Sequence, residues 1–249
     1  MPHIYLSPSK QPRNIYFDGK TTEEQSLNVI TDHLVEFLKP YDVKITRGGK
    51  KKEVADRITE ANSLDIHYYL SLHSNAGGGR GCETYYQVGT NKSNEIRVAS
   101  RNLALKLNND FAKITTTNDR DGDRGIKFKR LPDGRDWNME LRGVDAVANL
   151  IEIEFHDTKA GSEWILKNQK LIGVTIGQSL VSMFNLKLKP VPKPTPSLPE
   201  DEFYYVQTGA YKTLKEAEVE AKKVAGFTKS EVGIKFGNKY ALKWIKGIK

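Results

Sequence analysis

The chain has 249 residues, which is long enough for one full hydrophobic core and a small second module. Its formal net charge of +8 favours an anionic partner, such as nucleic acid, a membrane surface or an acidic polymer, without choosing among them. The single cysteine, Cys82, excludes an internal disulfide and a cysteine-rich zinc site. No run approaches the roughly 20 apolar residues of a membrane span, and the first residues lack the pattern of a signal peptide. We therefore expect neither membrane insertion nor export.

The first three quarters of the chain alternate between the periodicities of strands and helices. In chain order, the predicted elements are a strand at 3–7, a helix at 22–40, a strand at 43–47, a helix at 54–64, strands at 66–73 and 82–88, a helix at 96–114, a strand at 148–156 and a helix from Ser162. The first helix is the clearest, since Thr22 can cap it and Pro40 stops it. This order predicts an α/β fold with a mostly parallel sheet flanked by helices on both faces.

A proline-rich segment divides the chain. Residues 187–202, KLKPVPKPTPSLPEDE, carry a proline every two or three residues and predict an extended, semi-rigid linker. The sequence thus predicts a domain at 1–186 and a second one at 203–249. The second domain reads as a small α+β unit with strands at 204–211, 231–236 and 240–245 and a helix at 213–226.

Ionisable side chains collect near the ends of two predicted strands. His73 ends the strand 66–73, and ligands in parallel sheets bind beyond the carboxyl ends of the strands. In NLIEIEFHD, alternation separates two faces, one with Ile151, Ile153 and Phe155 and the other with Glu152, Glu154 and His156. Burying unpaired carboxylates costs several kcal/mol, so these need a cation, a metal or an open cleft. The alternative is an outward, solvated face.

The start of the first helix adds a further acidic group. In TTEEQSLN, either Glu23 or Glu24 could simply complement the helix dipole. A histidine at one strand end, a glutamate at a helix start and a glutamate on a neighbouring strand are also what a catalytic zinc site needs. Spacing alone does not establish this site, and a lone His73 is more often structural.

Several ordered blocks sharpen this interpretation: HIYLSPSKQPRN, TTEEQSLN, YYLSLHSNAGGGRGCETYY, DRGIK and NLIEIEFHD. Together they resemble the zinc-dependent N-acetylmuramoyl-L-alanine amidases of phage endolysins and sporulation wall hydrolases. The resemblance covers about residues 2–185. It implies a flavodoxin-like or phosphorylase-like α/β core with an open zinc site. It also implies an enzyme that cleaves the bond between the lactyl group of muramic acid and the L-alanine of the stem peptide.

The resemblance also implies roles for single residues. His73 matches one zinc ligand, and Glu24, which lies four residues before Asn28, matches another. Glu152 matches the catalytic glutamate, which moves a proton from water to the leaving amine. Glu154 is the alternative base. The residues expected on the substrate side are Asn75, Arg124, Glu154 and His156.

One ligand of the family is missing from this chain. The family usually places a histidine after the first strand, where this sequence has Lys10, Gln11 and Arg13. Lysine and arginine are cations and cannot serve as ordinary zinc ligands at neutral pH. We prefer Gln11 as the third zinc ligand, because the SPSKQ stretch resembles a variant that occurs within the family. His156 is the alternative, and a catalytically inactive wall-binding protein is the alternative to an enzyme.

The tail resembles a SPOR domain, a small fold that binds peptidoglycan. FYYVQTGAY carries the resemblance, but the second helix and the final strand of that fold are missing after YALKWIKGIK. The shortened sheet would leave an edge that a second copy, in a homodimer, or the first domain could cover. Alternatively, the module is generic and its lysines only confer solubility.

We therefore expect a peptidoglycan amidase, either a phage endolysin or a mother-cell lytic enzyme. It would be made in the cytoplasm without a signal peptide and would act on the wall after release. The positive charge suits an anionic wall. Nucleic-acid binding is disfavoured because the basic residues are dispersed and no aromatic-basic motif of a known reader is present.

Overall fold

The computed structural model describes residues 1–115, 123–190, 216, 219, 232–236 and 239–245. The chain divides into two compact units, Met1–Pro190 and Val191–Lys249. In the second unit, strands β7 (Val232–Phe236) and β8 (Lys239–Ile245) pair in an antiparallel manner, at the positions of the last two predicted strands. Most of the predicted linker at 187–202 and of the SPOR-like module at 203–249 lies outside the described residues.

The first unit contains all the elements predicted before residue 187 and two more. They are β1 (His3–Pro8), α1 (Glu23–Leu38), β2 (Lys44–Arg47), α2 (Val54–Ser63), β3 (Tyr68–Asn75), β4 (Cys82–Tyr86), α3 (Asn94–Phe111), β5 (Asp123–Lys127), α4 (Met139–Gly143), β6 (Val147–Phe155) and α5 (Lys159–Met183). The unpredicted ones, β5 and α4, have five residues each, too few for a periodic pattern. The helix expected from Ser162 starts at Lys159 because Thr158 caps it.

The six strands form one sheet in the order β2-β1-β3-β6-β4-β5. Strands β2, β1, β3 and β6 are parallel, whereas β4 runs antiparallel to β6, and β5 is parallel to β4. The fold class predicted from the sequence, a mostly parallel sheet flanked by helices, is confirmed. Strand β4 is the exception because only residues 76–81 separate it from β3, whereas a parallel crossover needs a dozen or more residues.

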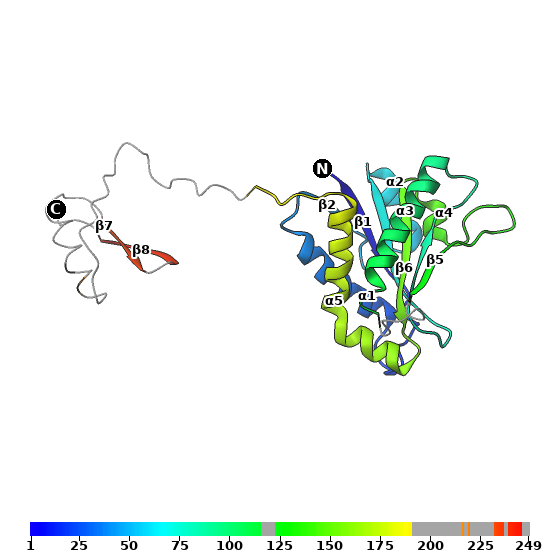
Figure 1. The fold of residues 1–249 in the computed structure, drawn as a ribbon, viewed down its shortest axis with the longest axis horizontal. Coiled ribbons are helices and arrows are strands. Elements are labelled where there is room, and N and C mark those ends of the chain that lie inside the picture. The colour runs from blue at the N-terminus through cyan, green and yellow to red at the C-terminus, as the bar shows by residue number, and fades with distance from the viewer. Residues whose placement is uncertain (116–122, 191–215, 217–218, 220–231, 237–238, 246–249) are drawn as a thin grey trace. The chain divides into compact units, whose positions relative to one another are not determined.

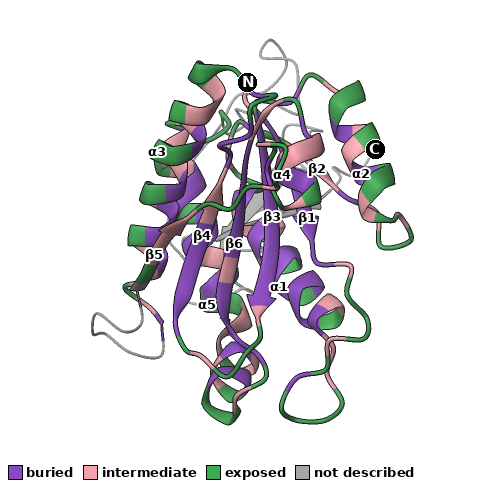
Figure 2. Ribbon diagram, turned by 90° about the vertical axis from the view of Figure 1, so that its right-hand side faces the viewer, coloured by how far each residue is buried: buried purple, intermediate pink, exposed green. Residues whose placement is uncertain are grey.

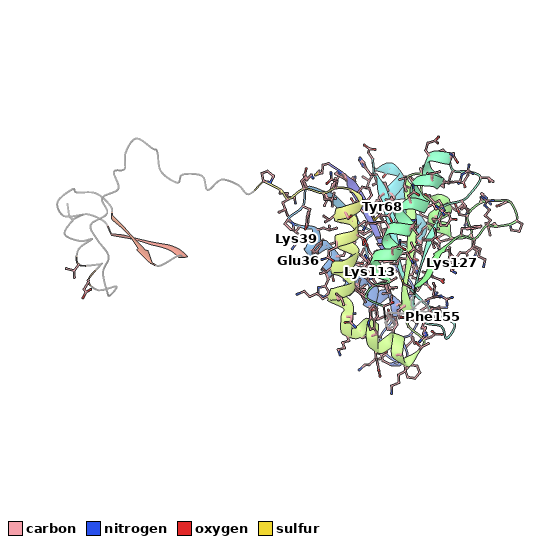
Figure 3. All side chains as sticks on the ribbon, in the orientation of Figure 1. Glu36, Lys39, Tyr68, Lys113, Lys127 and Phe155 are labelled. Carbon is pink, nitrogen blue, oxygen red and sulfur yellow. The ribbon has the colours of Figure 1, made fainter. Side chains whose placement is uncertain are left out.

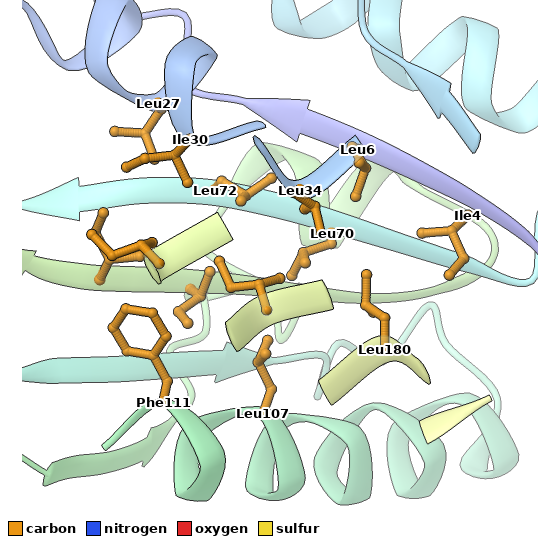
Figure 4. Packing of buried hydrophobic residues seen from close by; sticks show 14 of the residues in the cluster. Ile4, Leu6, Leu27, Ile30, Leu34, Leu70, Leu72, Leu107, Phe111 and Leu180 are labelled. Carbon is orange, nitrogen blue, oxygen red and sulfur yellow. The ribbon is translucent and has the colours of Figure 1, made fainter. Parts of the chain in front are cut away.

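Helices cover both faces of the sheet (Figure 1). On one face, α1, α3 and α5 pack against the strands through one large apolar cluster, part of which is drawn in Figure 4. On the other face, a smaller cluster joins α2 and α4 to the sheet. The central strands β3 and β6 are therefore largely buried (Figure 2), and polar groups on them need partners within the protein.

The position of α1 follows from its cap and from a close contact with α5. The side chain of Thr22 accepts the backbone N–H of Gln25, and the Gln25 side chain accepts the backbone N–H of Thr22. A Cβ at Gly173 of α5 would lie 2.6 Å from the carbonyl oxygen of Ile30, so only glycine allows this approach. Together these features hold the N-terminus of α1 at the carboxyl end of the sheet. Among the helices that the structure describes, none is long and apolar enough to cross a membrane.

Candidate active site

The candidate site lies at the carboxyl end of the parallel strands. In Figure 3, Tyr68 marks the amino end of the strands, where β3 starts, and Phe155 marks the carboxyl end, where β6 stops. His73 of β3 is the register partner of Glu152 on β6, and Glu83 of β4 pairs with Glu152 from the other side. The backbone ladders thus place one imidazole and two carboxylates on three neighbouring strands. The sequence predicts a site at this carboxyl end of the sheet.

Glu23, the first residue of α1, lies directly against His73. Its Oε1 is 2.9 Å from Nδ1 of His73, and its side chain is completely buried. The side-chain amide of Gln11 lies 3.2 Å from the same Nδ1. Asn14 links the two, since its Nδ2 donates to Oε1 of Gln11 at 2.5 Å and to Oε2 of Glu23 at 2.8 Å. Two side chains from the predicted metal region, Glu23 and Gln11, therefore converge on one nitrogen, and Asn14 holds them together.

Glu24, the predicted ligand, points elsewhere. Its Oε1 forms an ion pair with Nζ of Lys10 at 3.0 Å. Neighbouring residues on a helix point about 100° apart, so only one of Glu23 and Glu24 can face His73. The rotation of α1 about its axis thus brings Glu23, and not Glu24, to the imidazole.

A further carboxylate, Glu140 of α4, lies on the opposite side of the His73 ring. Its Oε2 is 3.5 Å from Nε2 of His73, and its side chain is buried. Hydroxyl groups of Ser7, Tyr69 and Ser71 donate to it. Sequence reasoning missed Glu140, because the only signal for its helix is the cap residue Asn138.

The buried charges shift one another's pKa values. Burial alone would lower the pKa of His73, but its hydrogen bonds to Glu140 and Glu23 and the charges of Glu23 and Glu152 raise that pKa well above its usual value. Burial would raise the pKa of Glu140, but His73 and the neighbouring hydroxyls lower it to about 2. The pKa of Glu23 is also lowered, because His73 and Asn14 outweigh its burial. The two carboxylates therefore favour the protonated form of His73 when no metal is bound.

Glu152 has a different environment. Burial, together with the charges of Glu23 and Glu83, raises its pKa to about 8 in spite of the opposing charge of His73. Its Oε2 has no hydrogen-bond partner among the described residues. An unpaired buried carboxylate oxygen in a native fold calls for an explanation, such as a proton, a water or a cation that occupies the site when the protein works.

Two of the predicted substrate-side residues meet at Glu83. Asn75 donates its Nδ2 to Oε1 of Glu83 at 3.1 Å, and Arg124 donates its Nε to Oε2 at 2.9 Å. The guanidinium of Arg124 also lies over the ring of Phe155, 5.0 Å from its centroid. The Arg124 side chain is 39% exposed, so a cation is held in a fixed position beside Glu152 and remains open to solvent.

The other two predicted substrate-side residues, Glu154 and His156, are buried in the scaffold. Glu154 accepts the backbone N–H of Gly81 at 2.5 Å and so ties the loop after β3 to β6. His156 directs Nδ1 to the carbonyl oxygen of Ser74 at 2.9 Å and stacks on Tyr16, with the ring centroids 5.0 Å apart. These contacts support the loops around the site.

The side chains around Nδ1 of His73 suit a zinc ion. We expect weaker binding here than at a zinc site with three strong ligands. Within the described part of the chain, no three His, Cys, Asp or Glu side chains form a metal-binding group. Glu23 and His73 are two ordinary zinc ligands, and Gln11 carries a neutral amide oxygen, which accepts Nδ2 of Asn14 in the metal-free protein. The unpaired Oε2 of Glu152 lies on the neighbouring strand. The residues present therefore fit an open site with two strong donors and one weak donor.

Comparisons with known proteins identify the family of the first unit. Residues 10–181 match the profile of the N-acetylmuramoyl-L-alanine amidase family. A search of curated proteins found no match.

Among solved structures, the chain is similar to Cwp6 from Clostridium difficile, with 20% identity and a TM-score of 0.63 over 73% of this chain and 29% of that one. It is also similar to the catalytic domain of the amidase CwlV from Bacillus (Paenibacillus) polymyxa var. colistinus, with 19% identity and a TM-score of 0.62 over 75% of this chain and 100% of that one. For the catalytic domain of the CD27L endolysin, which targets Clostridia difficile, the values are 18% and 0.50 over 73% of this chain and 98% of that one. These likenesses concern the fold.

Proposed function

The chain belongs to the N-acetylmuramoyl-L-alanine amidase family, and on this premise we propose that its first unit hydrolyses the amide bond between N-acetylmuramic acid and the L-alanine of the peptidoglycan stem peptide. The observation that carries the proposal is Glu152, which is half-buried and lies beside His73, and whose buried Oε2 has no hydrogen-bond partner among the described residues. A structural role offers no reason to keep such a group at a strand end. Neither the inactive wall binder nor the nucleic-acid binder is favoured by the family match.

The proposed metal is zinc, held by Glu23, His73 and the amide oxygen of Gln11. Bound there, zinc would polarise the scissile carbonyl and acidify a water molecule. Glu23 takes the place that the sequence motif assigned to Glu24, because Glu24 is paired with Lys10. Gln11 is preferred over His156, because Gln11 approaches Nδ1 of His73 whereas His156 is engaged by Ser74.

Glu152 is the proposed general base. It accepts a proton from the water that attacks the carbonyl carbon, and it returns this proton to the amine of L-alanine as the C–N bond breaks. Burial raises the pKa of Glu152 to about 8 in the metal-free protein, and a cation bound beside it would favour the ionised form that a general base needs. Glu154 is a poorer candidate, since its Oε1 accepts the backbone N–H of Gly81.

Arg124 is proposed to orient the substrate. Glu83 and Phe155 fix its guanidinium beside Glu152, while part of it remains exposed. Stem peptides carry carboxylates, which an arginine can bind in a bidentate manner. Asn75 shares Glu83 with Arg124 and so would stabilise the same arrangement.

For the module at 203–249, wall binding rests on its resemblance to a SPOR domain and on the positive charge of the chain. Both a phage endolysin and a mother-cell lytic enzyme are compatible with the proposed activity.

The test is digestion of purified peptidoglycan by the full chain, with and without a chelator, followed by addition of zinc. We expect free stem peptides that begin at L-alanine, identified by mass, to disappear on chelation and to return with zinc. Folded protein that binds walls but releases no peptide under any metal condition would support the inactive binder instead.

A further inference from the structure

Glu140 forms no part of the motifs that indicated the site, yet it is the centre of a buried polar cluster beneath His73. Its Oε1 accepts the hydroxyls of Ser7 at 2.6 Å and Tyr69 at 2.7 Å, and its Oε2 accepts the hydroxyl of Ser71. Tyr69, Ser71 and His73 alternate along β3 and so share the face on which Glu140 lies. Three hydroxyl donors and one imidazole thus meet a single carboxylate.

The donors in this cluster have fixed directions. Arg57, which is completely buried, donates Nη1 to the Ser7 hydroxyl oxygen at 3.3 Å, so the hydroxyl hydrogen of Ser7 is left for Glu140. Burial and the charge of Glu140 raise the pKa of Tyr69, so its hydroxyl stays a donor. Because an ionised carboxylate only accepts hydrogen bonds, the cluster is complete when Nε2 of His73 also donates to Glu140.

This contact determines which nitrogen of His73 faces the proposed metal. Nε2 lies 3.5 Å from Oε2 of Glu140, while Nδ1 lies 2.9 Å from Glu23 and 3.2 Å from Gln11. The two nitrogens lie on opposite sides of the ring, so Glu140 and Glu23 cannot bind the same ion. With its hydrogen on Nε2, the neutral imidazole presents the lone pair of Nδ1 to Glu23 and Gln11.

We propose that Glu140 is a positioning residue, which holds the hydrogen of His73 on Nε2 and so turns Nδ1 toward Glu23 and Gln11. Glu140 is itself held in place by the hydroxyl groups of Ser7, Tyr69 and Ser71. The inference rests on the proposed function only for the identity of the ion. A carboxylate behind a metal-bound histidine fixes the orientation of the ring and strengthens the ligand. In this chain, where one ligand is a neutral amide, that support compensates in part for the missing histidine.

The test compares Glu140→Leu with Glu60→Leu in the full chain. Glu60 is a matched control, since it lies on the same side of the sheet and accepts a tyrosine hydroxyl, that of Tyr5 at 2.6 Å. The first measurement is the long-range ¹H–¹⁵N spectrum of the imidazoles in metal-free, ¹⁵N-labelled protein, with His73 assigned among the five histidines through His73→Gln. The second is the zinc dissociation constant, by competition with a chromophoric chelator.

We expect a slowly exchanging, downfield Nε2 proton of His73 in the wild type and in Glu60→Leu, and its loss in Glu140→Leu. The zinc dissociation constant should rise roughly 10- to 100-fold in Glu140→Leu alone. An Nε2 proton that is the same in both variants would overturn the proposal. Because the spectrum is taken without metal or substrate, it decides the role of Glu140 even if the chain fails to cleave peptidoglycan.

If Glu140→Leu does not fold, Ser71→Ala and Tyr69→Phe replace it, since each removes one donor to the carboxylate and leaves the carboxylate present. We expect both to move the Nε2 proton of His73 upfield while their far-UV circular dichroism stays that of the wild type. An unmoved Nε2 proton in both variants would show that the cluster does not control the imidazole.

Discussion

His73 and Glu152 are register partners on the adjacent parallel strands β3 and β6. Their separation is therefore set by the backbone ladder of the sheet and not by a loop. Conservative changes at either position should alter the chemistry of the site without moving its backbone, which makes this pair suitable for the first experiments.

Glu152→Gln should reduce hydrolysis of peptidoglycan by roughly 10²- to 10⁴-fold, since the amide cannot accept the proton of the attacking water. Zinc affinity and sedimentation with purified walls should remain those of the wild type. Glu154→Gln serves as the control and should keep most of the activity, because Glu154 contacts the backbone of Gly81. An active Glu152→Gln enzyme would assign the base to another group.

The raised pKa of Glu152 predicts a pH dependence of stability in the metal-free protein. The folded state holds the Glu152 proton up to about pH 8, whereas the unfolded chain releases it near the ordinary glutamate pKa of 4.5. Between these values the unfolded state binds fewer protons, so the free energy of unfolding falls as the pH rises. Glu152→Gln should therefore unfold at a higher temperature than the wild type at pH 9, with a smaller difference at pH 5. Thermal unfolding in the presence of chelator measures both; a difference that does not grow with pH would contradict the shift.

Glu23→Gln and Glu24→Gln should differ in zinc affinity. Glu23 faces Nδ1 of His73, whereas Glu24 is paired with Lys10. We expect a large loss of zinc binding in Glu23→Gln and little change in Glu24→Gln, measured by chelator competition. The reverse result would restore the assignment that the sequence motif favours.

Gln11 is the third proposed ligand and offers a test in both directions. Gln11→Ala should lower zinc occupancy after dialysis, and Gln11→His should raise it above that of the wild type, because imidazole is a stronger zinc ligand than a neutral amide. Metal content by mass spectrometry gives the answer. Unchanged occupancy in Gln11→Ala would turn attention to His156.

Residues 1–190 correspond to the first compact unit. Alone, they should cleave soluble muropeptides at the rate of the full chain and should bind purified walls less well, because the basic C-terminal module is missing. Cosedimentation across a salt series measures the binding. Equal binding by the two forms would remove the role proposed for residues 203–249.

The sequence by itself determined most of the elements of the first unit and the general location of the site. Periodicity and the caps at Thr22 and Thr158 are local properties, because they depend on residues only a few positions apart. His73 and Glu152 could be identified for the same reason, as each occupies a recognisable position at the end of an apolar strand.

Only the tertiary structure shows that Glu23, and not Glu24, faces His73, and only it reveals the contacts of Glu140. The first choice depends on the rotation of α1, which packing against α5 and the sheet sets, and not on the helix-start motif. Glu140 reaches Ser71 across 69 positions of the chain, from a helix of five residues that carries no periodic signal. A buried carboxylate acquires its partners only when distant segments fold together, so its role cannot be read from its neighbours in sequence.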